Sequence, residues 1–287
     1  MPSSLDMPTP LVSTAWLADH LRDPRLRVLD ASMYLPTAGR DARAEYAAAH
    51  IPGAVFADLA WLSDPEAPFP HTLPAATLFS ERIGQLGVGS DDAAVVYDGS
   101  GQLFSAPRLW WMLRSFGHRQ VAVLDGTLTK WVADGYAVTD AVSAPTPAVF
   151  HATLDASRWR DIEAMRRNVT EQQAQVLDAR SPGRFSGAEA EPRAGVRGGH
   201  MPHSINVHYA TLSHSDGTLR SPEQLRALFD DRGVALDQPI VASCGTGVTA
   251  CAIMLALDTL GVDEKAVFDG SWTEWGSAVD TPVERSA

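Results

Sequence analysis

Four short motifs occur twice in this chain in the same order, and this internal repeat limits the possible folds more than any other feature of the sequence. The two members of each pair lie between 144 and 150 residues apart. The pairs are Val28-Leu29-Asp30-Ala31 with Val176-Leu177-Asp178-Ala179, His50-Ile51-Pro52 with His200-Met201-Pro202, residues 95–101 with 241–247, and Asp125-Gly126 with Asp269-Gly270. Such a repeat in a chain of 287 residues indicates two consecutive copies of one fold.

A segment rich in Pro, Ala, Ser and Thr, residues 139–147, lies between the two copies and is typical of a linker. We therefore expect an N-terminal domain over residues 10–140 and a C-terminal domain over residues 155–287. Each would have about 130 residues, which is a common domain size.

Short apolar and β-branched runs alternate with longer helical stretches in both copies. The predicted strands cover residues 27–29, 94–97, 121–124, 176–177, 239–243 and 266–268. The predicted helices cover residues 14–21, 75–85, 107–116, 222–232 and 248–260. This alternation predicts an α/β fold in which each domain is a mostly parallel sheet flanked by helices. Ligands of such sheets bind beyond the carboxyl ends of the strands.

Charge, apolar runs and cysteine content exclude several classes of protein. The formal net charge of −12 repels phosphate backbones, so nucleic acid is not an expected partner. The longest apolar run, residues 250–257, is too short to span a bilayer, and residues 1–10 lack the apolar core of a signal peptide. The two cysteines, Cys244 and Cys251, cannot form a disulfide framework. We expect a cytoplasmic protein with no membrane partner.

Cys244 lies where a predicted strand meets a predicted helix. The loop Cys244-Gly245-Thr246-Gly247 joins the strand at 239–243 to the helix at 248–260. Backbone N–H groups at a helix N-terminus and in a glycine-rich loop attract an anion, so this loop favours the thiolate form of Cys244. Cys244 is therefore a candidate nucleophile. Cys251 lies inside the apolar helix, and we expect it to belong to the core.

Residues 244–251 resemble the active-site loop of the rhodanese-like sulfurtransferases, in particular of the 3-mercaptopyruvate sulfurtransferases. The segment 200–206 is similar to the family signature Gly-His-Ile-Pro-Gly-Ala-x-Asn, and the segment 269–275 resembles a family motif near the C-terminus. The resemblance extends over roughly residues 11–281 and implies two tandem rhodanese-like domains.

The N-terminal copy of the cysteine loop differs from the C-terminal copy in two ways. Asp98 stands at the position of the cysteine, and the loop is two residues longer before its helix. A carboxylate cannot carry sulfur, and we expect the longer loop to have lost its cradle of N–H groups. The N-terminal domain is therefore predicted to be catalytically silent.

The resemblance implies a reaction cycle with a covalent intermediate. Cys244 takes sulfur from a small anionic donor and becomes a persulfide, which a thiol acceptor such as thioredoxin or a small thiol, or cyanide, then discharges. The loop holds this anion with backbone N–H groups. The loop residues assigned to substrate binding are Gly245, Gly247, Val248 and Thr249. No metal or organic cofactor is expected.

The residues after Cys244 indicate which donor is used. Thiosulfate-specific relatives carry two basic residues there, whereas this chain has the neutral Gly245 and Thr246. We therefore expect 3-mercaptopyruvate as the donor, with release of pyruvate, and thiosulfate as the alternative. The family's two substrate-binding arginines match Arg184 and Arg193, and arginine is suited to binding a carboxylate.

The resemblance also implies a path for the proton that the pyruvate enolate needs. Thr246 stands where the family has a serine of a proposed Ser–His–Asp relay, and His71 matches the histidine. The acid is missing, because Ala60 occupies its position and Asp58 and Asp64 are displaced from it. Thr246 and His71 are thus predicted catalytic residues of a relay that lacks its third member.

Two other classes fit the sequence less well. Cysteine-dependent phosphatases and arsenate reductases need an arginine six residues after the cysteine, where this chain has Ala250. A non-catalytic binding module of the same fold does not need the cysteine, and Cys244 is present.

Overall fold

Both copies of the Val-Leu-Asp motif form a strand of a parallel sheet, β2 (Leu26–Asp30) in the first copy and β7 (Gln175–Asp178) in the second. These sheets come from a computed structural model that describes residues 5–286. Within this range each sheet has five strands, in the orders β1-β5-β4-β2-β3 and β6-β10-β9-β7-β8. The other strands are β1 (Leu11–Val12), β3 (Val55–Phe56), β4 (Ala93–Tyr97), β5 (Val121–Leu124), β6 (Trp159–Arg160), β8 (Ser204–Asn206), β9 (Ile240–Ser243) and β10 (Lys265–Phe268). The predicted α/β fold with two copies of one sheet is confirmed.

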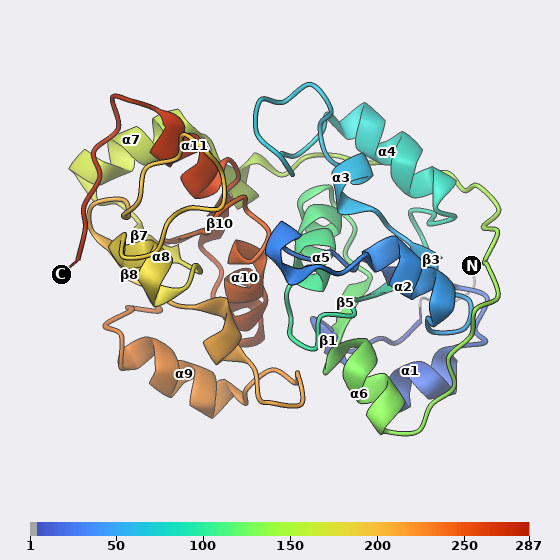
Figure 1. Ribbon diagram of the computed structural model, residues 1–287. Helices are drawn as coiled ribbons and strands as arrows, with labels where there is room; N and C mark the ends of the chain where they lie inside the picture. Colours follow the sequence, from blue (N-terminus) through green and yellow to red (C-terminus); the bar gives the residue numbers. More distant parts are fainter. Residues whose placement is uncertain (1–4, 287) are drawn as a thin grey trace. The chain divides into compact units, whose positions relative to one another are not determined.

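Helices lie on both faces of each sheet (Figure 1). In the first copy they are α1 (Thr14–His20), α2 (Ala42–Ala48), α3 (Leu59–Leu62), α4 (Ala76–Gln85), α5 (Ala106–Ser115) and α6 (Thr127–Ala133). In the second they are α7 (Ile162–Glu171), α8 (Pro182–Ser186), α9 (Pro222–Asp230), α10 (Ala250–Thr259) and α11 (Ser271–Ser277). Short 3-10 turns cover Pro36–Ala38, Ala156–Arg158 and Tyr209–Leu212. None of these helices in the described part of the chain has the length and apolarity that a bilayer crossing needs.

The core of each copy follows from the alternation of side chains along its strands. Val95 and Tyr97 on β4 pack with Leu17 of α1 and Trp131 of α6. Ala94 and Val96 point to the opposite face, where α5 contacts β4 and β5. The second copy repeats this plan, because α7 and α11 pack on one face of its sheet while α10 contacts β9 and β10. Strands buried on both faces explain the continuous apolar runs in the sequence.

The chain divides into two units whose boundaries cross the sequence repeat. The first unit contains the chain up to Pro65, Leu73–Leu154 and Ser213–Leu219. The second contains Glu66–Thr72, Asp155–Leu212 and the chain from Arg220 onward. Each unit thus includes a short segment from the other half of the sequence.

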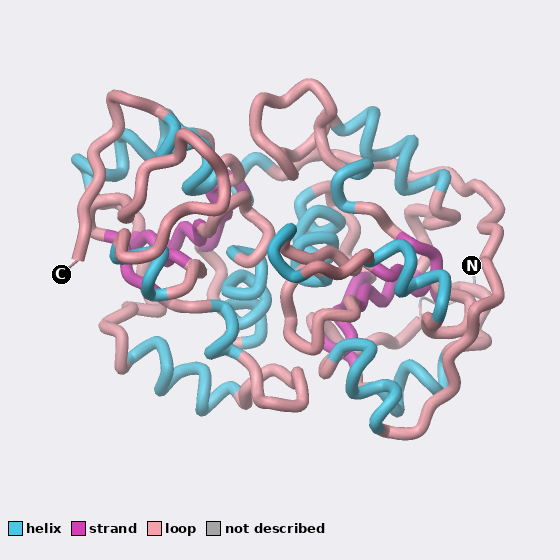
Figure 2. Tube along the Cα trace, in the orientation of Figure 1, coloured by secondary structure: helices cyan, strands magenta, loops and turns pink. Residues whose placement is uncertain are grey.

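The predicted linker is a loop that is bound to the first unit along its length. Figure 2 shows no helix or strand between α6 and the turn at Ala156–Arg158. The linker residue Thr139 pairs with His50, and further on the N–H of Ala148 donates to the carbonyl of Gly84. A β-carbon at Gly84 would lie 2.4 Å from the Ala148 carbonyl oxygen, so only glycine lets the linker approach α4 this closely.

Candidate active site

Cys244 directly follows β9, and its side chain is 2% exposed. The loop Cys244–Thr249 then leads into α10, which starts at Ala250. The predicted start of this helix at Val248 is wrong by two residues, because Gly247 has a φ of 76° and Val248 and Thr249 form a turn. The loop therefore has six residues between strand and helix, and Cys244 is its first residue.

The start of α11 holds the first half of this loop. The N–H of Trp272 donates to the Cys244 carbonyl at 2.9 Å, and the N–H of Thr273 donates to the Gly245 carbonyl at 2.9 Å. The hydroxyl of Thr273 donates to the same Gly245 carbonyl at 2.6 Å, and the Cys244 N–H donates to Ser271 Oγ at 3.1 Å. The motif at 269–275 thus fixes the backbone of the cysteine loop, a role that its sequence did not indicate.

The start of α10 holds the second half. The thiol of Cys251 donates to the Gly247 carbonyl at 3.3 Å. The N–H groups of Cys251 and Ala252 donate to the carbonyls of Val248 and Thr249, both at 3.1 Å. Cys251 itself is fully buried, as predicted for a core residue.

These carbonyl contacts fix the direction of the loop's N–H groups. In a trans peptide the N–H of the next residue points opposite to the carbonyl. Because α11 holds the carbonyls of Cys244 and Gly245, the N–H groups of Gly245 and Thr246 point away from α11. The carbonyls at residues 247–249 point into α10. The N–H groups of residues 248–250 therefore point away from the body of that helix.

Arg184 is the predicted substrate-binding residue that the structure brings to the cysteine loop. It lies in the short helix α8, and its side chain is 19% exposed. A β-carbon at Gly245 would lie 2.9 Å from Arg184 Nη2 and 3.8 Å from Nη1. The end of the guanidinium therefore faces the residue directly after Cys244, and any side chain at position 245 would displace it.

Arg184 belongs to a row of alternating charges. Its Nη2 lies 2.6 Å from Glu191 Oε2, and the other Glu191 oxygen lies 2.8 Å from Arg180 Nη1. Arg180 Nη2 in turn lies 2.6 Å from the buried carboxylate of Asp178. Burial on its own lowers the pKa of the Arg180 guanidinium, but the charges of Asp178 and Glu191 raise that pKa above its usual value overall. Arg180 therefore stays positively charged.

The remaining predicted residues include Thr246, which belongs to the loop itself, and residues from other parts of the chain. Thr246 is half-buried, and so is Arg193, which makes no hydrogen bond or ion pair with the described residues. His71 is half-buried, has a φ of 65° and belongs to the Glu66–Thr72 segment of the second unit. Ala60 is exposed, and the carboxylate of Asp58 accepts N–H groups at the start of α3, so Asp58 is engaged as a helix cap.

The loop of the first copy keeps a cradle of N–H groups, so the predicted loss of that cradle is wrong. Asp98 is fully buried, and its Oδ2 accepts the N–H groups of Phe104, Ser105 and Ala106 at 3.2, 3.0 and 2.9 Å. Its Oδ1 accepts the N–H of Ser100 at 2.9 Å. The two extra residues do not open the loop, because the Asp98 carboxylate fills it and gathers the N–H groups at the start of α5.

We expect Asp98→Ala to lower the free energy of unfolding by about 3 kcal/mol, because the buried N–H groups of Ser105 and Ala106 lose the carboxylate oxygen that accepts them. Urea denaturation followed by fluorescence measures this change. Asp91→Ala removes an exposed carboxylate from the same domain and should change stability by less than about 0.5 kcal/mol. Equal unfolding midpoints for the two variants would contradict the role given to Asp98.

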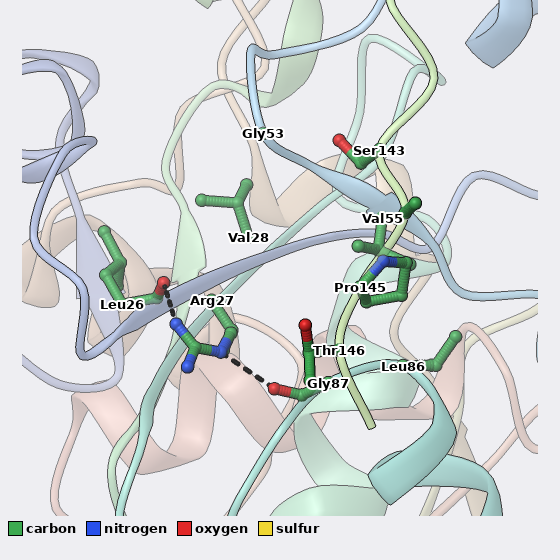
Figure 3. Close-up of a pocket in the computed structure, with 11 residues that line it drawn as sticks. Leu26, Arg27, Val28, Gly53, Val55, Leu86, Gly87, Ser143, Pro145 and Thr146 are labelled. Atoms are coloured by element: carbon green, nitrogen blue, oxygen red, sulfur yellow. Dashed lines mark hydrogen bonds between the residues drawn. The ribbon is translucent and has the colours of Figure 1, made fainter. Parts of the chain in front are cut away.

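A separate cavity of about 420 Å³ lies in the first unit beside the beginning of β2. Figure 3 shows the Arg27 guanidinium on its wall, hydrogen-bonded to the carbonyls of Leu26 and Gly87. The other lining residues are Val28, Gly53, Val55, Leu86 and residues 143–146. No cysteine, histidine or carboxylate is among the residues that line this cavity, and it lies near the amino end of β2 rather than at the carboxyl ends of the strands.

The family described as the Rhodanese-like domain matches residues 13–134 and again residues 161–278. The chain belongs to the rhodanese-like family, in a form with two tandem domains.

Similar proteins of known activity include two kinds of sulfurtransferase. The 3-mercaptopyruvate sulfurtransferase of Homo sapiens is 45% identical over 92% of this chain and 91% of that protein. The thiosulfate sulfurtransferase of Rattus norvegicus is also 45% identical, over 92% and 91%. The crystal structure of SseA from Escherichia coli, one of the 3-mercaptopyruvate sulfotransferases, has a TM-score of 0.84 and 39% identity over 92% of this chain and 99% of that one. The predicted family and the sulfurtransferase class are confirmed, whereas equal identity to both relatives does not distinguish between their donors.

Proposed function

We propose that this sulfurtransferase takes sulfur from 3-mercaptopyruvate, holds it as a persulfide on Cys244 and passes it to a thiol or to cyanide. The Cys244 thiolate attacks the sulfur of the donor, the carbon–sulfur bond breaks, and its electron pair leaves on carbon as the enolate of pyruvate. A proton converts the enolate to pyruvate. An acceptor thiolate or cyanide then attacks the outer sulfur and regenerates the Cys244 thiolate.

The direction of the loop's N–H groups supports a persulfide at this position. The N–H groups of residues 245, 246 and 248–250 point away from α11 and α10. Cys244 is the first residue of the same loop. Fixed N–H dipoles stabilise an anion more than water does, because they need no reorganisation when the charge arrives. Gly245, Gly247, Val248 and Thr249 are the loop residues that we assign to binding.

The contact between Gly245 and Arg184 is the single observation that favours mercaptopyruvate. A basic side chain at position 245, as in the thiosulfate-specific relatives, would occupy the place of the Arg184 guanidinium. With glycine there, one planar guanidinium lies beside the residue that follows Cys244, which suits one carboxylate. We assign Arg193, which has no partner among the described residues, as the second binding residue.

For the unmodified chain we expect kcat/KM to be higher with 3-mercaptopyruvate than with thiosulfate by at least about tenfold, a difference of about 1.4 kcal/mol. Steady-state rates with cyanide as a common acceptor measure the ratio. A higher kcat/KM with thiosulfate would favour the alternative function, a thiosulfate sulfurtransferase.

We further propose Thr246 and His71 as the path of the proton to the enolate. The assignment of the Glu66–Thr72 segment to the unit that carries Cys244 supports this pairing. Ala60 cannot act as the acid, and Asp58 caps the start of α3, so we include no carboxylate in the proposed path.

The N-terminal domain is proposed to be catalytically silent, since Asp98 fills the loop that carries the nucleophile in the second copy. The domain limits of 10–140 and 155–287 stay predictions. The same holds for thioredoxin as a particular acceptor and for the cytoplasmic location.

A further inference from the structure

The carboxylate of Glu191 is enclosed between two guanidinium groups, and its side chain is only 4% exposed. Its Oε1 accepts from Arg180 Nη1 at 2.8 Å and from Arg184 Nε at 3.3 Å. Its Oε2 accepts from Arg184 Nη2 at 2.6 Å. A buried carboxylate is stable only when it is paired in this way, so Glu191 and the two arginines form one charge cluster.

Arg180 is the member of this cluster whose side chain is held in place most firmly. Its guanidinium is fully buried and hydrogen-bonded to Asp178 and, at 2.8 Å, to the carbonyl of Gly199. The same group lies 4.3 Å from the ring of Trp272, and the backbone N–H of Trp272 donates to the Cys244 carbonyl. Glu191 is therefore anchored to the framework that also fixes the cysteine loop, and only Arg184 is partly open to solvent.

The position of Glu191 fixes which atoms of Arg184 can meet a substrate. Glu191 binds the edge formed by Nε and Nη2, whereas Nη1 makes no hydrogen bond to any described residue. Because a guanidinium is planar, holding one edge fixes the direction of the remaining N–H groups. Those groups lie at the end of the side chain that faces Gly245.

We propose that Glu191 is a positioning residue that directs the Arg184 guanidinium toward the carboxylate of the donor. This inference rests on the proposed function, because it takes Arg184 as the residue that binds that carboxylate. Glu191 also balances charge, since the charges of Asp178, Arg180, Glu191 and Arg184 add up to zero. At Arg184 the donor therefore meets N–H groups with a fixed direction, whose positive charge is balanced within this cluster.

The first test is steady-state kinetics of Glu191→Gln. Glutamine has the same size, but it offers one acceptor oxygen and turns an NH₂ group toward an arginine donor, so Arg184 loses its fixed plane. We expect KM for mercaptopyruvate to rise by about tenfold while kcat changes by less than about threefold. Glu191→Asp keeps the charge and shortens the side chain by one methylene, and its KM should lie between those of the wild type and Glu191→Gln.

The second test measures carboxylate recognition without sulfur transfer. Bromopyruvate and bromoacetone both alkylate a thiolate, which forms a carbon–sulfur bond and expels bromide, but only bromopyruvate carries a carboxylate. The ratio of their rates of alkylation at Cys244, followed by peptide mass, reports how well the carboxylate is bound. We expect Glu191→Gln to lower this ratio by about tenfold.

Arg197→Gln is the matched control for a loss of stability. Arg197 donates to the carbonyls of Gly276 and Thr281 at 3.1 and 3.0 Å and has no hydrogen bond to Arg184, so its loss should leave the alkylation ratio unchanged. A wild-type ratio in Glu191→Gln would overturn the inference. An unchanged ratio in Arg184→Ala would instead show that Arg184 does not bind the carboxylate of the donor. If Glu191→Gln does not fold, the same comparison with Glu191→Asp decides, and a wild-type ratio there overturns the inference.

Discussion

Replacing Cys244 by Ser is expected to lower kcat by more than about a thousandfold, because a serine hydroxyl does not form a persulfide and is a far weaker nucleophile at neutral pH. Pyruvate release from mercaptopyruvate measures the loss. Incubation with the donor should add the mass of one sulfur atom to the Cys244 peptide of the wild type and none to the variant. This experiment tests the central residue of the proposed cycle.

Cys251→Ser is the matched control, since it makes the same chemical change seven residues further along the chain. Cys251 is fully buried and donates its S–H to the Gly247 carbonyl, and a serine hydroxyl can make the same hydrogen bond. We expect kcat within about threefold of the wild type. Turnover retained by Cys244→Ser would exclude Cys244 as the sulfur carrier.

Replacing Arg184 by Ala is expected to raise KM for mercaptopyruvate by about a hundredfold, which corresponds to the loss of a charged, two-point contact with a carboxylate. For Arg193→Ala we expect about tenfold, because a single contact is lost. The separation of KM from kcat in initial-rate measurements distinguishes binding from chemistry.

Arg184→Lys separates the effect of charge from that of the planar guanidinium. A lysine keeps the charge, but its single ammonium cannot both pair with Glu191 and present a planar edge to the donor. We expect its KM to remain closer to that of Arg184→Ala than to that of the wild type. An unchanged KM in Arg184→Ala would place the carboxylate-binding residue elsewhere. In that variant Glu191 keeps its pair with Arg180, so folding should be retained.

Most of the long elements of the fold could be read from the sequence, although the ten-residue helix α7 was missed, whereas the two-residue strands could not be read. Strands β4 and β5 and helix α10 contain enough consecutive apolar residues to show their type. The edge strands β1 and β6 have two residues each, which is too few to show an alternation. These strands exist because the neighbouring strands β5 and β10 offer free edges, and that is a tertiary effect.

The site was predictable where local context decided it and not where distant residues met. Cys244 stood out because strand, glycines and helix are contiguous. Glu191 could not be predicted as part of the site, because nothing in the sequence shows that two arginines enclose it. Ser271 has a φ of 50°, and its counterpart Thr127 has a φ of 63°. A hydroxyl residue after both Asp-Gly pairs was the signal that could have pointed to the segment holding the cysteine loop.

The Asp98 loop has a consequence for how the whole chain responds to dissolved anions. Asp98 is an anion that the chain itself supplies, and a few rotatable bonds give it an effective concentration far above that of any solute. Salts and sulfur donors therefore do not compete for the first loop, although its N–H groups are arranged to receive them. The duplicated fold keeps two such loops, but only the loop of Cys244 can take an external anion. Titration with donor should therefore saturate at one sulfur atom per chain.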